Sequence, residues 1–222
     1  MNVWRRVFGA LLGRRLPLVD GDLVVEGLRD EITIRRDVWG VPHVTASSEA
    51  DVWYGLGFCQ GQDRGFQLES LLRVFRGTLA EMVGADGLAV DRISRRIGFR
   101  RAAEAQLDVL DDDIAAGAAA FAAGVNAGRA QGLPRRPHEL TLLRTEPTPW
   151  DAADPLAMAK LMAFLLGANW DSELARLQIL RADGPEALAR VDPSFPEWHP
   201  VTSPPTIEAG PAVDRLAEDL GR

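Results

Sequence analysis

Apolar positions recur every three or four residues along most of this chain, a spacing that predicts a mainly helical protein. The central stretch, residues 51–83, is predicted to form one long helix. Gly57, Gly61 and Gly65 fall four residues apart and therefore share one stripe of that helix. Each glycine costs roughly 1 kcal/mol relative to alanine inside a helix. We interpret the stripe as the place where a second backbone comes very close.

Polar and large apolar residues alternate along the same helix instead of separating onto two faces. This indicates a helix buried on several sides, with an internal polar network. The polar members are Gln60, Gln62, Asp63, Arg64, Gln67 and Glu69. For the neighbours Asp63 and Arg64 two interpretations stay open: a catalytic pair, or the favoured alternative of a buried ion pair within the network.

The region before the central helix reads as short strands. Residues 22–28 and 31–37 are predicted strands joined near residues 27–30, and 41–45 is a third after a turn at Gly40. Ile32 and Ile34 alternate with polar neighbours, as expected for a strand with one buried face.

Helices are predicted again after the central stretch. A short helix or connector covers 91–99, and residues 100–131 form two alanine-rich helices divided at Asp111–Asp113. A further helix begins at Asp154–Pro155 and is apolar almost all round, so we expect it to be buried. It breaks at residues 167–170, and a second amphipathic helix continues to Gly184.

The chain therefore divides into three parts. Residues 1–15 form a basic N-terminal segment, either a frayed end or an amphipathic segment that touches a protein or membrane surface. Residues 16–191 form the main domain. Residues 192–222 form a proline-rich tail followed by a short helix, which suits a strap or linker better than a packed core.

Composition narrows the possible partners. The 222 residues are 46% apolar, enough for a core. The net charge of -7 and the pI of about 5.1 argue against a nucleic-acid partner. Cys59 is the single cysteine, which excludes a disulfide within the chain. No apolar run is long enough to cross a bilayer. The N-terminus makes a poor secretory signal, which favours the cytoplasm.

The sequence contains no complete active site. The three histidines, His43, His138 and His199, lack metal-ligand spacing, and no nucleophile motif or phosphate-binding loop occurs. Glu173 follows the helix break at residues 167–170, with Asp171 close by. Two readings stay open for Glu173: a ligand for a hard cation such as Ca²⁺, or an acid favoured at a helix N-terminus by the helix dipole.

Several separate motifs, in a fixed order, resemble the α subunit of the penicillin acylase (penicillin amidase) family over roughly residues 16–192. They are RDVWGVPHVTA (36–46), GFCQGQDRGFQLESLLRVFRGTLAE (57–81), FAAGVNAG (121–128), PHELTLLRTEPTPWDAADPLAMAKLMAF (137–164) and NWDSEL (169–174).

The resemblance implies an N-terminal-nucleophile hydrolase of linear amides. In that family one precursor, or zymogen, cuts itself into an α chain, a spacer and a β chain. The nucleophile is the serine that starts the β chain, and its own α-amino group is the base. The expected fold class is α+β: this chain, mostly helical with a few N-terminal strands, would be the α-subunit portion of an αββα sandwich that the β chain completes. Many such proteins are periplasmic or secreted.

The same resemblance implies roles for particular residues, and none of them is catalytic. Glu173 would help to bind a structural Ca²⁺ shared with the β chain. A second set would line the acyl pocket for a small N-acylated substrate, such as a β-lactam antibiotic or an acyl-homoserine lactone: Met162, Phe164, Leu166, Asn169 and Trp170. A third set would hold the packing between the chains and assist precursor folding: Arg36, Asp37, Gln60, Asp63 and Arg64.

On this reading the chain alone is inactive, because no serine in it starts a chain. We expect the isolated chain to leave its glycine stripes and the helix 156–166 partly uncovered. The alternative is a truncated, inactive fragment or a free-standing interaction module.

Overall fold

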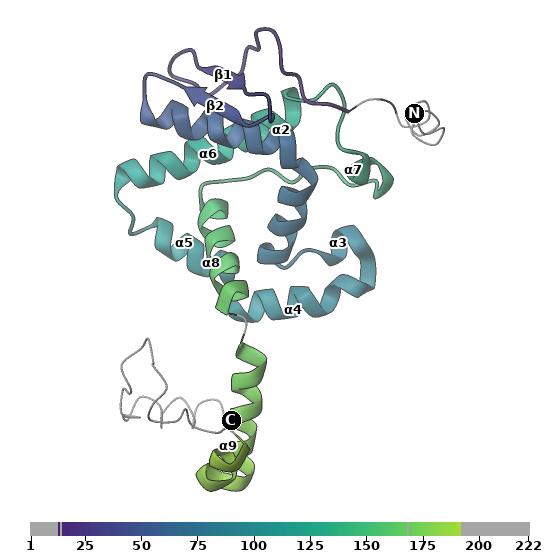
Figure 1. Ribbon diagram of the computed structural model, residues 1–222, viewed down its shortest axis with the longest axis vertical. Helices are drawn as coiled ribbons and strands as arrows, with labels where there is room; N and C mark the ends of the chain where they lie inside the picture. The colour runs from purple at the N-terminus through teal and green to yellow at the C-terminus, as the bar shows by residue number, and fades with distance from the viewer. Residues whose placement is uncertain (1–12, 14, 168, 192–222) are drawn as a thin grey trace. The chain divides into compact units, whose positions relative to one another are not determined.

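The computed structural model describes residues 13, 15–167 and 169–191 (Figure 1). The described part is predominantly helical with one small sheet, as predicted. Its elements are β1 (Thr33–Arg36), β2 (Pro42–Thr45), α2 (Glu49–Arg76), α3 (Ala80–Val83), the 3₁₀ turn η1 (Gly84–Gly87), α4 (Leu88–Ile97), α5 (Phe99–Leu107), α6 (Asp112–Gln131), α7 (His138–Leu142), α8 (Ala153–Gly167) and α9 (Trp170–Val191). Two compact units, divided after Gly167, are described separately.

β1 and β2 form an antiparallel hairpin in which Ile34 lies opposite Val44. The turn between the strands is organised by Asp37, whose Oδ1 accepts hydrogen bonds of 2.9 Å from the backbone N–H groups of Trp39 and Val41. The inner face of the hairpin packs on α2 at Gly55, where the side chains of Val44 and Ile32 leave no room for a Cβ. Figure 1 shows the hairpin lying along the first half of α2.

The predicted strand at residues 22–28 is wrong for this chain. These residues lie beside the hairpin without joining its sheet, which has only two strands in the described part of the chain. The strand predicted at 31–37 is shortened to β1, and its partner is β2 instead of residues 22–28.

Local capping sets the limits of α2. Ser48 is the N-cap, and its Oγ accepts a hydrogen bond from the backbone N–H of Asp51. Gly77 ends the helix in the left-handed conformation, with φ of 68°. The predicted helix at 51–83 was therefore too long, and α3 follows as a separate turn. Arg64, with φ of -127° and ψ of 23°, interrupts the helical geometry of α2.

Glycines let α2 and α6 touch backbone to backbone. A Cβ at Gly57 or Gly61 would collide with the carbonyl oxygen of Phe121 or Val125. On α6, Gly124 and Gly128 lie equally close to backbone atoms of Tyr54 and Phe58 in α2. The predicted close approach is thus confirmed. Gly65 is the exception, because its Cβ would meet only Pro137 Cγ at an ordinary 3.5 Å and Arg129 Cγ at 3.7 Å.

The core of the first unit gathers around Trp150. The Phe75 and Phe121 rings meet its indole edge-on, with ring centroids 6.0 and 6.3 Å away. Other core members come from α2, α5, α6 and α8: Leu68, Leu72, Phe99, Ala103, Ala122, Val125, Ala153, Ala157 and Leu161.

Helix α8 buries only one face in this chain. Ala153, Ala157 and Leu161 face the core, whereas Leu165 and Leu166 are 54% and 85% exposed. The expectation that this helix is buried all round is therefore wrong here. The expectation of a partly uncovered helix in the isolated chain is met. The accompanying expectation of partly uncovered glycine stripes is wrong, because the glycines of both stripes are buried where α2 packs on α6.

The second unit contributes α9 to the described part. α8 ends at Gly167 and α9 begins at Trp170, so the predicted break is present. α9 kinks at Gly184, whose φ of 80° departs from helical geometry before Pro185. Within the described ranges no helix combines the length and apolar character needed to cross a bilayer. The predictions for the basic N-terminus and the proline-rich tail fall almost wholly outside the described residues.

Candidate functional site

The five residues predicted to line an acyl pocket divide between the two units. Met162 and Phe164 are half-buried and pack against the core, where the Phe164 ring meets Phe99 at 5.6 Å between centroids. Leu166 ends the same helix with 85% of its surface exposed. Asn169 and Trp170 belong to the second unit and are exposed, Trp170 by 45%. Phe164 thus supports the end of α8, while Leu166 offers free apolar surface.

Glu173 stands in the first turn of α9 with its carboxylate exposed. Its Oε1 accepts hydrogen bonds from Arg176 at 2.9 Å and from Asn169 at 3.4 Å. Ca²⁺ takes six to eight oxygen ligands. The described residues contain no group of three carboxylates, histidines or cysteines that could hold a metal. A calcium site here therefore needs most of its ligands from outside the described part of the chain.

Arg36 and Asp63 belong to the set expected to hold the packing between the chains, and in this structure they link the hairpin to the central helix. Both guanidinium Nη atoms donate to the Asp63 carboxylate at 2.9 Å, a bidentate pair. Arg36 also donates to Gln62 Oε1 at 2.6 Å. The amide of Gln62 in turn donates to the carbonyls of Leu18 and Gly132, at 2.7 and 2.8 Å. Gln62 therefore ties the chain at Leu18 to the end of α6.

The other predicted network members are placed elsewhere. Asp37 organises the hairpin turn, and the hydrogen bond from the Val41 N–H lowers the pKa of its carboxyl below the usual value. Gln60 is half-buried. Arg64 is exposed and makes no ion pair with the described residues, so the predicted Asp63–Arg64 pair is wrong. Consecutive helical residues point about 100° apart, and Asp63 turns towards Arg36 instead.

Glu69 forms the most deeply buried charge cluster, and its place at the centre was not predicted. Its carboxylate, with no exposed surface, accepts hydrogen bonds from Arg73 Nε at 2.7 Å and from Arg129. The N–H and hydroxyl of Thr148 donate to it at 2.8 and 2.7 Å. Burial acts to raise the pKa of Glu69, but the Thr148 and Arg129 hydrogen bonds outweigh it and the pKa is lowered. The cluster joins α2, α6 and the segment before α8.

A second unpredicted cluster surrounds the buried carboxylate of Asp154. It accepts from Arg76 Nε at 2.9 Å and from Arg100 Nη1 at 2.7 Å. Arg100 also makes two 2.8 Å bonds to Asp151, which hold the pKa of Asp151 low against the opposing effect of burial. Asp154 was predicted only as the start of a helix. The structure shows that it also fixes α8 to α2 and α5.

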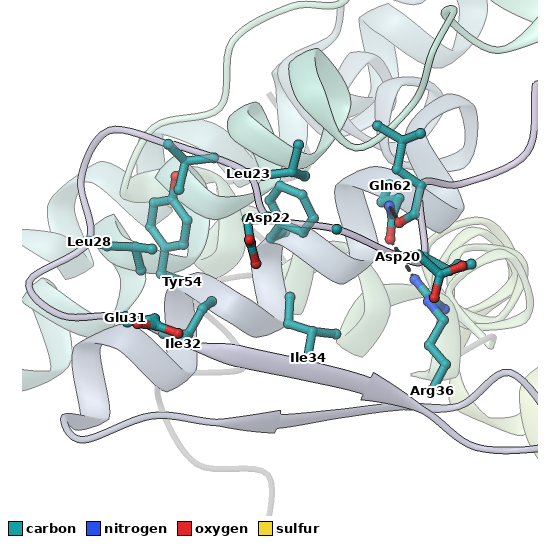
Figure 2. A pocket seen from close by; sticks show the side chains of 15 residues that line it. Asp20, Asp22, Leu23, Leu28, Glu31, Ile32, Ile34, Arg36, Tyr54 and Gln62 are labelled. Atoms are coloured by element: carbon teal, nitrogen blue, oxygen red, sulfur yellow. Dashed lines mark hydrogen bonds between the residues drawn. The ribbon is translucent and has the colours of Figure 1, made fainter.

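A cavity of about 450 Å³ lies between the N-terminal strap, residues 18–28, the hairpin and α2 (Figure 2). One end is closed by Arg36 and Gln62, and the other by Tyr54, whose hydroxyl donates to the Glu26 carbonyl at 2.8 Å. Apolar residues make up much of its lining: Leu18, Val19, Leu23, Val25, Leu28, Ile32, Ile34 and Phe58. Asp20, Asp22 and Glu31 line it as well (Figure 2). The cavity was not predicted from the sequence. Residues 22–28, which cover it, were predicted to form a strand.

Among the described residues no serine or cysteine is hydrogen-bonded to a histidine or a lysine. The hydroxyls of Ser47 and Ser48 donate to the carboxylates of Asp30 and Asp51, and His43 faces Asp37 at 3.3 Å. Burial raises the pKa of the Cys59 thiol to about 11, so the thiol stays protonated at neutral pH. This geometry supports packing and binding.

Comparison with solved structures places the fold among the N-terminal-nucleophile hydrolases. The thermostable penicillin G acylase from Alcaligenes faecalis superposes with a TM-score of 0.60 at 25% sequence identity. The match covers 81% of this chain and 98% of the matched chain. The family model for penicillin amidase matches residues 31–206. The chain belongs to the penicillin amidase family, which confirms the resemblance seen in its motifs.

Curated relatives agree with that assignment. Penicillin acylase 2 proenzyme from Pseudomonas sp. (strain SE83) is 33% identical over 216 residues, which cover 93% of this chain and 28% of the relative. The acyl-homoserine lactone acylase QuiP of Pseudomonas aeruginosa is 31% identical, over 82% of this chain and 22% of that protein. This chain therefore spans less than a third of the length of these relatives.

Proposed function

We propose that this chain is the α subunit of an amidohydrolase that cleaves the amide bond of N-acylated compounds. The observation that carries the proposal is a contrast in coverage. The chain matches 98% of one chain of a solved penicillin G acylase but only 28% of a full-length proenzyme relative. A chain that corresponds to one whole subunit of a longer precursor accounts for both values.

The chemistry then belongs to a β chain. The serine at the start of that chain attacks the amide carbonyl, and its own α-amino group takes up the hydroxyl proton. The amine leaves, and water hydrolyses the resulting acyl-enzyme. Two of its relatives are named penicillin acylase and acyl-homoserine lactone acylase, so penicillins and acyl-homoserine lactones are the proposed substrates.

Each unit of this chain contributes side chains to the proposed substrate site. In the first unit, Leu166 presents exposed apolar surface at the end of α8, and Phe164 is anchored on Phe99. In the second unit, Trp170 at the start of α9 is 45% exposed. Met162 and Asn169 complete the proposed set. An acyl group needs a concave apolar surface, which such a helix end supplies once the β chain covers it.

We also propose that Glu173 provides one ligand of a structural Ca²⁺. Its carboxylate is exposed at the start of α9, where a partner can reach it. The remaining ligands would come from the β chain, since the described residues offer no further cluster. Calcium would then join the two chains without taking part in the reaction.

The proposal is tested by co-expressing this chain with its downstream coding region and measuring amine release from substrates with short, long and aromatic acyl groups. We expect hydrolysis by the assembled protein. In that protein Trp170→Ala should change the ratio of kcat/KM values between acyl groups by about tenfold, a change typical of altered apolar contacts. Absence of hydrolysis across the series would contradict the amidohydrolase assignment. An unchanged ratio would remove Trp170 from the pocket.

A further inference from the structure

Residues 22–26 of the strap present Val24 to the outside. Asp22, Leu23 and Val25 line the cavity, whereas Val24 does not and is 94% exposed. The run from Leu23 to Val25 alternates with the period of two that is typical of a strand. Gly21 and Gly27, with φ of 100° and 96°, bound the segment at both ends. The segment therefore covers the cavity on one side and leaves the side chain of Val24 uncovered.

The backbone of this segment lacks the hydrogen bonds that a strand normally makes. Among the described residues, no N–H group of residues 22–26 donates a hydrogen bond. One carbonyl accepts, that of Glu26, from the Tyr54 hydroxyl. An extended stretch of unpaired N–H and C=O groups is a template for pairing with another strand. The sequence favours a strand here, and the described residues supply no partner for it.

The surroundings hold the segment in place without covering it. Tyr54 fixes one end through Glu26, and the Leu18 N–H donates to the Gly132 carbonyl at 2.9 Å near the other. Arg29 N–H donates to Asp51 Oδ1 at 2.9 Å just beyond. Figure 2 shows the strap crossing above the hairpin, with the cavity between them. The strap is thus held in position before a partner binds, so binding would cost little conformational entropy. Its outer side and its backbone N–H and C=O groups stay accessible.

We propose that residues 22–26 pair with a strand of the β chain, extending a sheet across the boundary between the two chains. The inference rests on the proposed function, because the occupant is the part of the protein that this chain does not contain. The chain spans 28% of a proenzyme relative, and under the proposed function the β chain makes up the larger part of the protein. Strand pairing would satisfy the open backbone groups and cover Val24, as in other cases of strand addition.

Hydrogen exchange in the assembled protein tests the pairing. Amides of residues 22–26 that pair with the β chain should exchange at least about a hundredfold more slowly than those of Arg135 and Arg136, exposed residues whose N–H groups donate no hydrogen bond to the described residues. Only one edge of a strand faces a given neighbour, so protection should alternate along the segment.

A matched pair of substitutions gives a second readout. Val24→Asp places a charge on the proposed buried face, whereas Val109→Asp places the same charge on a valine that is also largely exposed, by 80%. Neither should disturb the fold of this chain. Val24→Asp should speed dissociation of the two chains by about tenfold or more. Burying a valine side chain lowers a dissociation constant by about tenfold or more, and such changes act mainly on the dissociation rate. Val109→Asp should leave it unchanged.

The outcomes separate this inference from the proposed function. If a β chain co-purifies but residues 22–26 exchange as fast as Arg135 and Arg136, or both substitutions act alike, the pairing is wrong and the subunit assignment stands. If the protein purifies as copies of this chain only, the subunit assignment fails and the pairing with a β chain falls with it. Protection of residues 22–26 in such an assembly would identify a second copy as the occupant.

Discussion

At the scale of single residues, Glu69 is a carboxylate with no exposed surface in the interior of the first unit. Its fully buried carboxylate accepts hydrogen bonds from two arginines and from both polar groups of Thr148. A buried charge is tolerated only when partners replace the water it has lost. Removing that charge leaves Arg73 and Arg129 in the interior without their counter-ion.

We expect Glu69→Gln to lower the free energy of unfolding by about 3 kcal/mol, as when one partner of a buried ion pair is lost. Glu81→Gln is the matched control, because Glu81 pairs with the same Arg73 at 3.1 Å but is 69% exposed. Its loss should cost less than about 1 kcal/mol. Chemical unfolding followed by near-UV circular dichroism measures both. Equal effects would contradict the special role of the buried pair.

The lowered pKa of Glu69 also predicts an acid dependence. The unfolded carboxyl titrates near 4.5, and the folded one below it. The unfolded chain therefore binds more protons in that window, so the stabilisation is complete above about pH 4.5 and is lost as pH falls through the folded pKa. Unfolding free energy measured from pH 3 to 7 should fall less steeply on the acid side for Glu69→Gln. Identical profiles would contradict this.

At the scale of elements, the contact between α2 and α6 organises the first unit. Gly57 faces the Phe121 carbonyl too closely for any side chain, whereas Gly65 has room for a methyl group. Gly57→Ala should therefore destabilise the protein by about 1–3 kcal/mol through overpacking. Gly65→Ala should be neutral, or stabilising by up to about 1 kcal/mol through helix propensity. Thermal unfolding of the two variants checks this, and a Gly57→Ala protein as stable as Gly65→Ala would contradict it.

Sequence reasoning worked best where a local pattern decides the structure. The glycine spacing predicted the approach of a second backbone, and the break at residues 167–170 followed from residue types at the site itself. The end of α2 was missed although Gly77 marked it, because the apolar period continues into α3. Attention to Gly77 as a C-cap would have corrected the boundary.

Long-range pairing was not available from the sequence. Asp63 was paired with its neighbour Arg64, but its partner is Arg36 on the hairpin, 27 residues away. The partners of Glu69 include Arg129 and Thr148, 60 and 79 residues away. The i, i+4 spacing of Glu69 and Arg73 was the one local signal of that cluster. The segment 22–26 has strand-like residues, but a strand also needs a partner for its backbone.

At the scale of the whole molecule, the proposed calcium site predicts a response to chelator. Glu173→Ala should lower the melting temperature of the assembled protein and abolish any further loss caused by EDTA, because one ligand is already gone. Glu139→Ala is a suitable control, since Glu139 is likewise an exposed acid in the first turn of a helix. Thermal unfolding with and without EDTA would show this. The same EDTA effect in Glu173→Ala and in the unaltered protein would remove Glu173 from a metal site.

Two apolar surfaces of this chain are left uncovered. The end of α8 and the outer side of residues 22–26 expose apolar side chains that a free-standing domain would bury, notably Leu166 and Val24. Both are explained if this chain is one subunit of a larger amidohydrolase.

Intact mass spectrometry of the protein purified from its own cells under native conditions tests this claim most directly. The account predicts that this chain is held in equal amount by a second, larger chain whose first residue is serine. A folded, monodisperse protein made of this chain alone would contradict it.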